Sequence, residues 1–240
     1  MRKFLLLLAM VLAYTSLYAK TYVMIAGVSK YPGNVKNLWF DANDAKVMKN
    51  LYVANGNSYV ITLTDSLATP QRVLKGLKQA FSKAKKEDAI VFFFAGHGYP
   101  GGFMCYGGTI SYEEIINIMK KSKARNKMVF ADACYSGKAR YSNERTQKKY
   151  NQNIMFFLSS RSNEFSWQLS TMKNSFFTAY LERGMRGAAD SNRDKKVSAH
   201  ELYEYVHTRV VERADTLNQH PVMWGNFDDN MTIIDWNNKR

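Results

Sequence analysis

The sequence predicts an α/β fold with a mostly parallel central sheet and helices on both faces. Short runs that are apolar throughout recur along the chain, and amphipathic segments with helix-start signals separate them. Continuous apolar strands are typical of parallel sheets, because both faces of such a sheet are covered. The length of 240 residues and the hydrophobic content of 46% suit one domain with a sizeable core.

The first half of the chain alternates strands with helices. We expect strands at residues 21–27, 58–64 and 89–95, which are rich in β-branched and aromatic residues. The first helix is predicted at 38–54, with acids in its first turn, where they favour the helix dipole. Thr69 and Pro70 supply a cap and a first-turn proline for the second helix.

The second half continues the alternation after a glycine-rich segment that predicts a hairpin. A capping box at Ser111–Glu114 begins a helix that runs to about Lys121. Further elements follow: strands at 127–133 and 153–159, helices at 175–186 and 198–213, and a last strand at 231–235. Strands separated by helices in this way indicate a parallel sheet.

The N-terminus predicts an export signal. Two basic residues precede the apolar run Phe4–Ala13, and Leu17-Tyr18-Ala19 is a plausible cleavage site. The apolar run is shorter than the ~20 residues that span a bilayer. We therefore expect residues 1–19 to be a signal peptide and residues 20–240 to be a single domain, periplasmic or secreted, with no transmembrane segment after signal removal. An uncleaved anchor is the alternative.

The chain is strongly basic, with a formal net charge of +14. Its lysines are spread over predicted helices and loops, which favours a solvated basic surface over a dedicated nucleic-acid site. No element that would read nucleic acid is recognisable. We therefore expect no specific nucleic-acid partner, although non-specific adhesion to nucleic acid or to an anionic envelope stays open.

A thiol and an imidazole follow two of the predicted strands. Cys134 lies in the turn Asp132–Gly137, and His97 lies between two glycines after the strand at 89–95. The carboxyl ends of strands in open α/β folds hold the functional groups. Together the two residues predict nucleophilic catalysis, because a thiol needs a neighbouring base to become a reactive thiolate. The amides of Gly98 and Cys134 are candidate donors to an oxyanion.

Two other interpretations of Cys134 remain open. Free cysteine is often a small buried hydrophobe. In an exported chain, Cys134 and Cys105 are also the two halves of a potential disulfide, although spacing alone does not settle pairing.

The ordered motifs resemble the caspase and metacaspase family of cysteine peptidases (clan CD, peptidase C14). The similar pieces cover most of the chain from residue 20: Tyr22–Tyr31, Asp41–Ala45, Gly96-His97-Gly98 and Asp132–Gly137. The resemblance implies a caspase-like fold and hydrolysis of peptide bonds by a Cys134–His97 dyad, with no cofactor required.

The resemblance also implies a substrate preference. Caspases that cut after aspartate carry basic residues in the pocket for the residue before the cut (P1), whereas this chain offers Asp132 and Asp44, with Asp41 as a third candidate. Carboxylates select a guanidinium or an ammonium. The implied partners are peptides or proteins with Arg or Lys at P1. A helix-dipole role for Asp44 and a turn-forming role for Asp132 are the structural alternatives.

Two loops carry further functional signals. The basic loop at 138–152 is either a processing site for such an enzyme or an uncleaved solvated loop. Residues 190–201 have the spacing of an EF-hand loop, although Lys195 replaces its usual glycine and a metal-free capped turn is the alternative. The six candidate calcium ligands are Asp190, Asn192, Asp194, Lys196 through its carbonyl, Ser198 and Glu201.

The leading hypothesis is an exported cysteine endopeptidase. The alternative is a binding or scaffold protein with the same fold, whose chemistry is silent or redirected. The presence of both Cys134 and His97 favours the enzyme.

Overall fold

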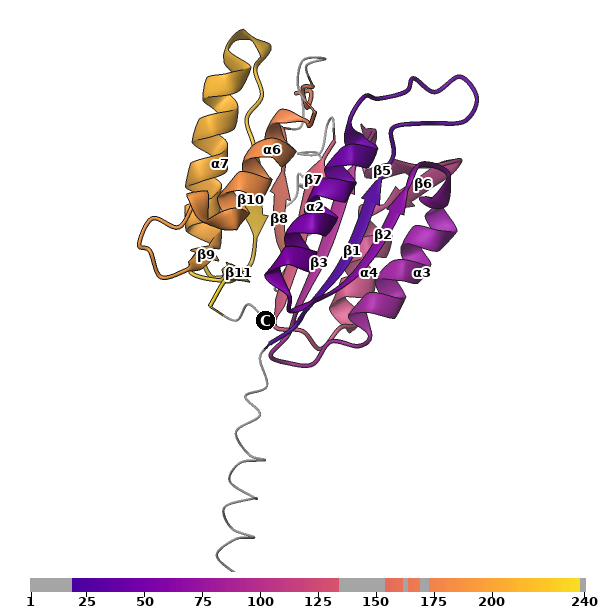
Figure 1. The fold of residues 1–240 in the computed structure, drawn as a ribbon. Coiled ribbons are helices and arrows are strands. Elements are labelled where there is room, and N and C mark those ends of the chain that lie inside the picture. The colour runs from indigo at the N-terminus through magenta and orange to yellow at the C-terminus, as the bar shows by residue number, and fades with distance from the viewer. Residues whose placement is uncertain (1–18, 134–153, 162–163, 169–172, 238–240) are drawn as a thin grey trace, which may run out of the picture.

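A six-stranded sheet forms the centre of the protein. The computed structural model describes residues 19–133, 154–161, 164–168 and 173–237. The strand order is β10-β8-β7-β3-β1-β2, and every pairing is parallel except that of β10 with β8. The strands are β1 (Thr21–Gly27), β2 (Ser58–Thr64), β3 (Ala89–Ala95), β7 (Asn126–Asp132), β8 (Met155–Leu158) and β10 (Val222–Gly225). The predicted mostly parallel sheet is confirmed (Figure 1).

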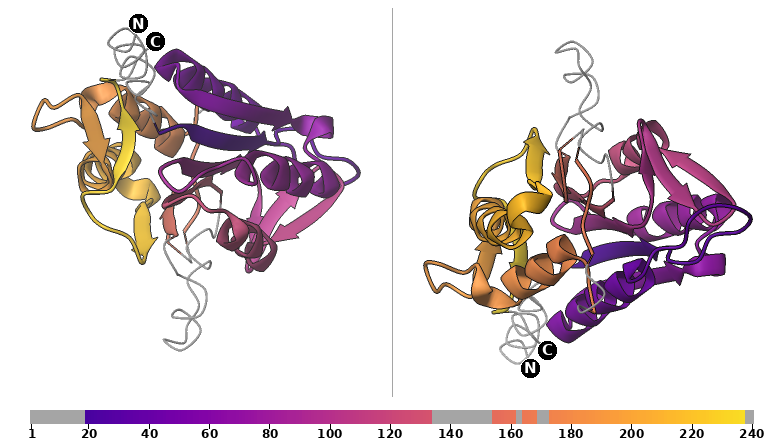
Figure 2. Two further views of the ribbon diagram at one scale, coloured as in Figure 1. Left: turned by 90° about the horizontal axis from the view of Figure 1, so that it is seen from below. Right: turned by 90° about the horizontal axis from the view of Figure 1, so that it is seen from above.

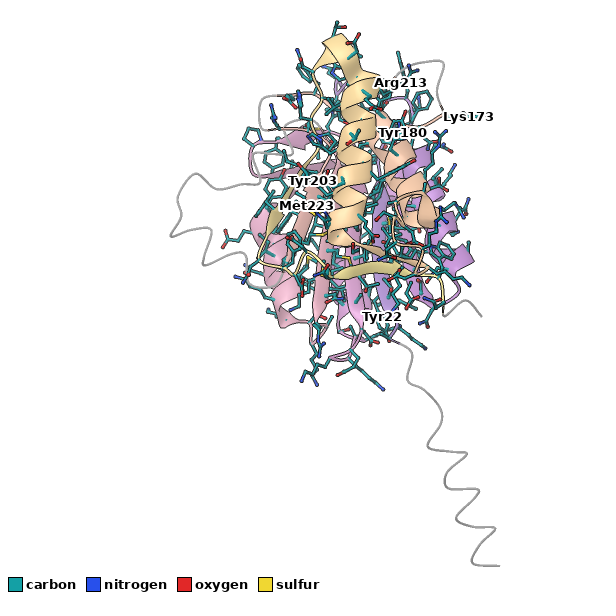
Figure 3. The ribbon with its side chains drawn as sticks, turned by 90° about the vertical axis from the view of Figure 1, so that its left-hand side faces the viewer. Tyr22, Lys173, Tyr180, Tyr203, Arg213 and Met223 are labelled. Atoms are coloured by element: carbon teal, nitrogen blue, oxygen red, sulfur yellow. The ribbon has the colours of Figure 1, made fainter. Side chains whose placement is uncertain are left out.

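Helices cover both faces of the sheet (Figures 1 and 2). One face packs against α3 (Pro70–Phe81) and α4 (Tyr112–Lys121). The other packs against α2 (Asp41–Asn55), α6 (Phe176–Arg183) and α7 (Ala199–Ala214). Figure 3 shows α7, which carries Tyr203, lying across this second face, with Met223 of β10 beside it. Each face therefore contributes one half of the core, as the apolar strands require.

Two small sheets lie beside the central one. The predicted glycine-rich hairpin is a three-stranded sheet of β4 (Gly98–Tyr99), β5 (Gly102–Cys105) and β6 (Gly108–Ser111). The predicted last strand is β11 (Thr232–Asp235), which pairs with β9 (Lys196–Ser198) and not with the main sheet. The short helical turns are Asp65–Leu67, Gly184–Ala188 and Asp215–Leu217.

The first helix begins three residues later than predicted, at Asp41, because its start is held by the end of β1. Phe40 provides no side-chain cap. Instead, the Ser29 hydroxyl accepts a hydrogen bond from the Ala42 amide at 2.8 Å, which satisfies a helix-start donor. A Cβ on Gly27 would lie 2.3 Å from the Asp41 carbonyl oxygen. Glycine thus lets the helix start approach the strand closely, and this contact fixes the position of Asp41.

The other helix starts agree with the predicted caps. Thr69 accepts from the Arg72 amide and Pro70 opens α3. Ser111 begins α4 and Ser198 begins α7, each through a complete capping box. In the part of the chain that the structure describes, no helix is long and apolar enough to cross a bilayer. The predicted signal peptide and the loop at 138–152 lie outside the described residues.

Candidate active site

The strands that lead to the predicted thiol and imidazole are neighbours. Strands β3 and β7 pair in parallel, and their register ends with Ala95 opposite Asp132. The Gly96 amide continues the ladder by donating to the Asp132 carbonyl oxygen at 3.1 Å. Cys134 lies outside the described residues, but it follows Asp132 by two positions, just as His97 follows Ala95. The predicted adjacency of the two strand ends is confirmed.

The His97 ring is held by the segment after β1. Its Nε2 lies 2.7 Å from the Lys36 carbonyl oxygen. A carbonyl only accepts, so Nε2 carries the proton in this contact and Nδ1 is the nitrogen that can exchange one. The Tyr31 ring packs against the imidazole, with ring centroids 4.8 Å apart. The imidazole therefore has a defined tautomer and one packed face.

Tyr31 also holds the backbone of His97. Its hydroxyl accepts from the His97 amide at 2.8 Å and donates to the Met104 carbonyl oxygen at 3.2 Å. Burial raises the pKa of the Tyr31 phenol, so the hydroxyl keeps its proton for this bond. A Cβ on Gly96 would lie 2.7 Å from the same hydroxyl. Glycine before His97 is thus required for the close approach of Tyr31.

A cavity of about 190 Å³ opens between these strand ends. Gly96 and Ala133, the residues directly before His97 and Cys134, both line it. The remaining described lining comes from the segment before α2 and the loop after β8: Lys36, Asn37, Leu38, Trp39, Asp41, Asp132, Ser166, Trp167 and Gln168. The cavity is therefore placed to hold the side chain of a molecule that reacts at the predicted dyad.

The three predicted pocket acids form one buried group beside this cavity. Asp132 accepts from the Ser166 hydroxyl, and from both the amide and the hydroxyl of Thr178 at 3.1 and 2.7 Å. Asp44 accepts from Asn174 at 2.8 Å, from the Ser175 amide at 3.3 Å and from the Ser175 hydroxyl. These donors occupy both oxygens of each carboxyl. Asp132 and Asp44 are therefore already satisfied by the protein.

Asp41 differs from the other two acids. Its Oδ2 accepts from the Gln168 side-chain amide at 2.8 Å, the one side-chain donor the described residues give it. Asp41 lines the cavity, whereas Asp44 is fully buried and is not among the described lining residues. Asp41 was the weakest of the three candidates from sequence, but it is the carboxyl best placed to bind a ligand in the cavity.

Burial raises the pKa of all three carboxyls, and repulsion between the acids adds to the effect at Asp41 and Asp44. Desolvation raises the pKa of Asp41 to about 7, and the charge of Asp132 adds to the effect while the Gln168 hydrogen bond opposes it. Desolvation raises the pKa of Asp44 well above its ordinary value, followed by repulsion from Asp132 and Asp41. Desolvation also raises the pKa of Asp132, against four hydrogen bonds that lower it. The raised pKa values mean that the protonated, neutral forms of these acids are favoured over the charged forms.

The hydrogen-bond partners of the acids were missed by the sequence analysis. Ser166 and Gln168 follow β8, and Ser175 and Thr178 begin α6. All are far from the acids in sequence, and no motif marks them. The one available signal was the position of Ser166 and Gln168 in a loop that follows a sheet strand.

Gln219 holds this loop in place. It is 1% exposed, and its amide donates to the Ser159 carbonyl oxygen and to the Ser166 hydroxyl at 3.0 and 3.3 Å. Its oxygen accepts from the Trp167 amide at 3.0 Å. The Trp167 indole donates to the Leu217 carbonyl oxygen at 2.7 Å. The cavity wall is therefore fixed, with Trp167 as part of it.

Two further tryptophans and Cys105 differ in their surroundings. Trp39 lines the cavity and is 63% exposed, whereas Trp224 stacks on Phe156 with centroids 4.3 Å apart. Cys105 is a free, fully buried thiol whose pKa burial raises to about 12. It is therefore an inert part of the core, and it supports the interpretation that the two cysteines are not bridged.

The 190–201 loop forms a compact turn. Asp190 accepts from the Lys195 amide at 2.9 Å, and Asn192 accepts from the Asp194 amide at 2.9 Å. Glu201 completes the capping box of α7 with Ser198. Among the described residues, no three acids, histidines or cysteines lie close enough together to hold a metal ion. Calcium binding by Asp190, Asn192, Asp194, Lys196, Ser198 and Glu201 stays a prediction.

The fold and the paired strand ends define a caspase-like domain, and comparisons with known proteins agree. The family model of the peptidase C14 caspase domain matches residues 20–231. Caspase-1 from Spodoptera frugiperda has the same fold, with a TM-score of 0.66, 13% identity and coverage of 90% of each chain. A protein from Geobacter sulfurreducens matches with a TM-score of 0.64 and 18% identity, over 87% of this chain and 94% of its own. No curated protein matches.

The chain belongs to the peptidase C14 caspase-domain family, a family of cysteine peptidases. The sequence resemblance to that family is thereby confirmed.

Proposed function

We propose that this protein is an exported cysteine endopeptidase that cuts after Arg or Lys. The observation that carries the proposal is the buried group of acids beside a cavity bounded by the residues before His97 and Cys134. A cavity with a carboxyl at its wall suits a cationic side chain, and the adjacent strand ends supply the reacting groups.

The proposed reaction proceeds in two steps. The Cys134 thiolate attacks the scissile carbonyl carbon, and the electron pair of the C=O bond moves to the oxygen, which the Gly98 and Cys134 amides stabilise. The tetrahedral species collapses, the C–N bond breaks, and His97 gives its proton to the leaving amine. Water then attacks the acyl carbon and loses a proton to His97, and the C–S bond breaks to release the carboxylic acid and restore the Cys134 thiolate beside the protonated His97.

Asp41 is the proposed receptor of the P1 cation. Asp41 lines the cavity, and the single side-chain hydrogen bond that it receives among the described residues, from Gln168, leaves its carboxyl the capacity to bind a guanidinium or an ammonium. Asp132 adds negative charge at the same wall of the cavity. Asp44 is fully buried and adds to the charge of the group without lining the cavity. Trp39 and Trp167 offer aromatic surface to the methylene stem of the substrate side chain.

The proposed activity should depend on pH through Asp41. Its pKa of about 7 means that its negative charge appears as the pH rises through neutrality. We expect the ratio of kcat/KM for an arginine peptide to that for the matching citrulline peptide to rise between about pH 6 and pH 8. Citrulline is nearly isosteric but uncharged, so titration of the dyad cancels in the ratio. A ratio that falls or stays flat over this range would exclude Asp41 as the titrating receptor.

The alternative, a scaffold with silent chemistry, predicts no turnover. Turnover of fluorogenic peptides with Arg, Lys, citrulline or Asp at P1 distinguishes the peptidase from the scaffold. Each peptide is tested with calcium and with chelator, and Cys134→Ala is the control. We expect turnover of the Arg and Lys peptides and none in the variant. Equal turnover by Cys134→Ala would exclude the thiol mechanism, and preference for Asp would exclude the acidic pocket.

A further inference from the structure

A cluster of exposed cations lies at the end of the molecule away from the candidate active site. It comes from the start of β1, the ends of α3 and α4, and the loops that join these helices to β3 and β7. We call it the basic edge, and its exposed residues are Lys20, Lys78, Lys83, Lys85, Lys86, Lys121, Lys123 and Arg125.

The topology brings these residues together. The amino ends of β1, β3 and β7 meet at one edge of the sheet, because the three strands are parallel neighbours. The two loops touch: the Arg125 amide donates to the Lys86 carbonyl oxygen at 3.1 Å. The Ala89 amide donates to the Lys20 carbonyl oxygen at 2.9 Å, which joins the start of β1 to the same edge. Figure 1 shows these helix ends and strand starts at the lower end of the molecule.

Few acids offset the charge of the basic edge. Asp88 is buried, and its carboxylate accepts from the amides of Lys20 and Lys85 at 2.8 and 2.7 Å. Glu87 is exposed within the cluster, and Asp228 shares a hollow with Arg125. None of the ion pairs found among the described residues involves a cation of the basic edge. The basic edge therefore presents a strongly positive surface.

The basic edge also contains an apolar slot. A hollow of about 180 Å³ lies between α3 and α4, with Phe81 and Ile118 among its walls and Lys78 and Lys121 beside them. Apolar surface framed by lysines suits the boundary between lipid headgroups and acyl chains, where the stems pack and the charged ends meet phosphate.

We propose that the basic edge docks on an anionic lipid bilayer. A bilayer fits better than nucleic acid because the site combines charge with an apolar slot, which a phosphate backbone does not need.

Docking in this orientation leaves the active site open to the surroundings. The carboxyl ends of the strands, with the cavity, lie at the opposite end of the molecule. Figure 3 shows this separation: Tyr22, near the start of β1, and Lys173, whose carbonyl oxygen accepts from Asn43 in α2, lie at opposite ends. Proteins that approach the membrane would thus reach the cavity.

Co-sedimentation with vesicles tests the proposal. Residues 20–240 contain every described element of the fold and are used beside the full chain. The vesicles are phosphatidylcholine alone, or one part phosphatidylglycerol to two parts phosphatidylcholine. We expect binding to the anionic vesicles only, weakened by salt. The variant Lys85→Gln/Lys86→Gln/Lys121→Gln/Lys123→Gln should lose about a hundredfold or more in affinity, since each basic residue near such a surface contributes about a fivefold factor.

A second variant separates local from overall charge. Lys30→Gln/Lys46→Gln/Lys49→Gln/Lys195→Gln removes the same number of exposed cations outside the basic edge. We expect it to bind like the parent chain, and both variants to keep parent circular dichroism. Equal losses in the two variants, or equal binding to neutral vesicles, would overturn the proposal. Tighter binding to a nucleic-acid duplex than to anionic vesicles, lost in the first variant alone, would assign the edge to nucleic acid and also overturn it.

Discussion

Replacing His97 by alanine should lower kcat/KM for an arginine peptide by about a thousandfold, because a positioned general acid–base contributes about 10²–10⁴ in rate. The Lys36 carbonyl oxygen sets the tautomer of the ring and Tyr31 packs against it. These two contacts fix the orientation of the imidazole. The measurement is steady-state hydrolysis of a fluorogenic peptide by the parent and variant proteins.

Tyr31→Phe should lower the activity less than His97→Ala does. It keeps the ring that packs on His97 but removes the oxygen that accepts from the His97 amide. We expect a loss of about tenfold in kcat, with KM little changed, since an unsatisfied buried donor costs about 1–3 kcal/mol and shifts the ring. If His97→Ala keeps more than a tenth of the parent activity while folded, the imidazole has no part in the chemistry.

Replacing Asp41 by asparagine should lower kcat/KM for the arginine peptide by about a hundredfold, since a hydrogen bond to a charged group contributes about 1.5–3 kcal/mol. Hydrolysis of the citrulline peptide should change little. The reason is the placement of Asp41 at the cavity wall, with Gln168 as its described side-chain partner. The Arg-to-citrulline ratio should also lose its pH dependence near neutrality.

Asp44→Asn is the matched control for this effect. It makes the same isosteric change one helical turn away, at a carboxyl that is fully buried and already bonded to Asn174 and Ser175. We expect a smaller change in the Arg-to-citrulline ratio and a larger change in thermal stability. A greater loss of arginine preference in Asp44→Asn than in Asp41→Asn would show that the inner acid is the receptor.

The strands were predictable because most of their residues are apolar, β-branched or aromatic. The predicted bounds of β1, β2 and β3 agree with the structure: β1 and β3 are buried runs inside the sheet, and β2 is a half-buried edge strand. Strand β10 was missed because it is four residues long, pairs antiparallel at an edge and carries no regular pattern. The start of α2 was misplaced because the partner of its first amides is Ser29, on another element.

The site was predictable only in part. His97 and the three acids lie in sequence motifs that marked them as candidates, and the pairing of Ala95 with Asp132 brings together the strand ends that lead to His97 and Cys134. The sequence did not predict which of the three acids is best placed to bind a ligand. This depends on which carboxyl accepts hydrogen bonds from residues at the start of α6 and in the loop after β8. Those contacts join residues more than thirty positions apart, and local pattern does not encode them.

The most direct test is to find which residue a peptidyl-arginine chloromethyl ketone modifies. This reagent places a guanidinium in the P1 pocket and alkylates the nucleophile. Mass spectrometry of the digested protein should find the adduct on Cys134, with loss of activity in parallel, slower labelling in Asp41→Asn and none by the peptidyl-aspartate analogue. An adduct on another residue, or faster labelling by the aspartate reagent, would contradict the proposed Cys134 nucleophile with an acidic P1 pocket.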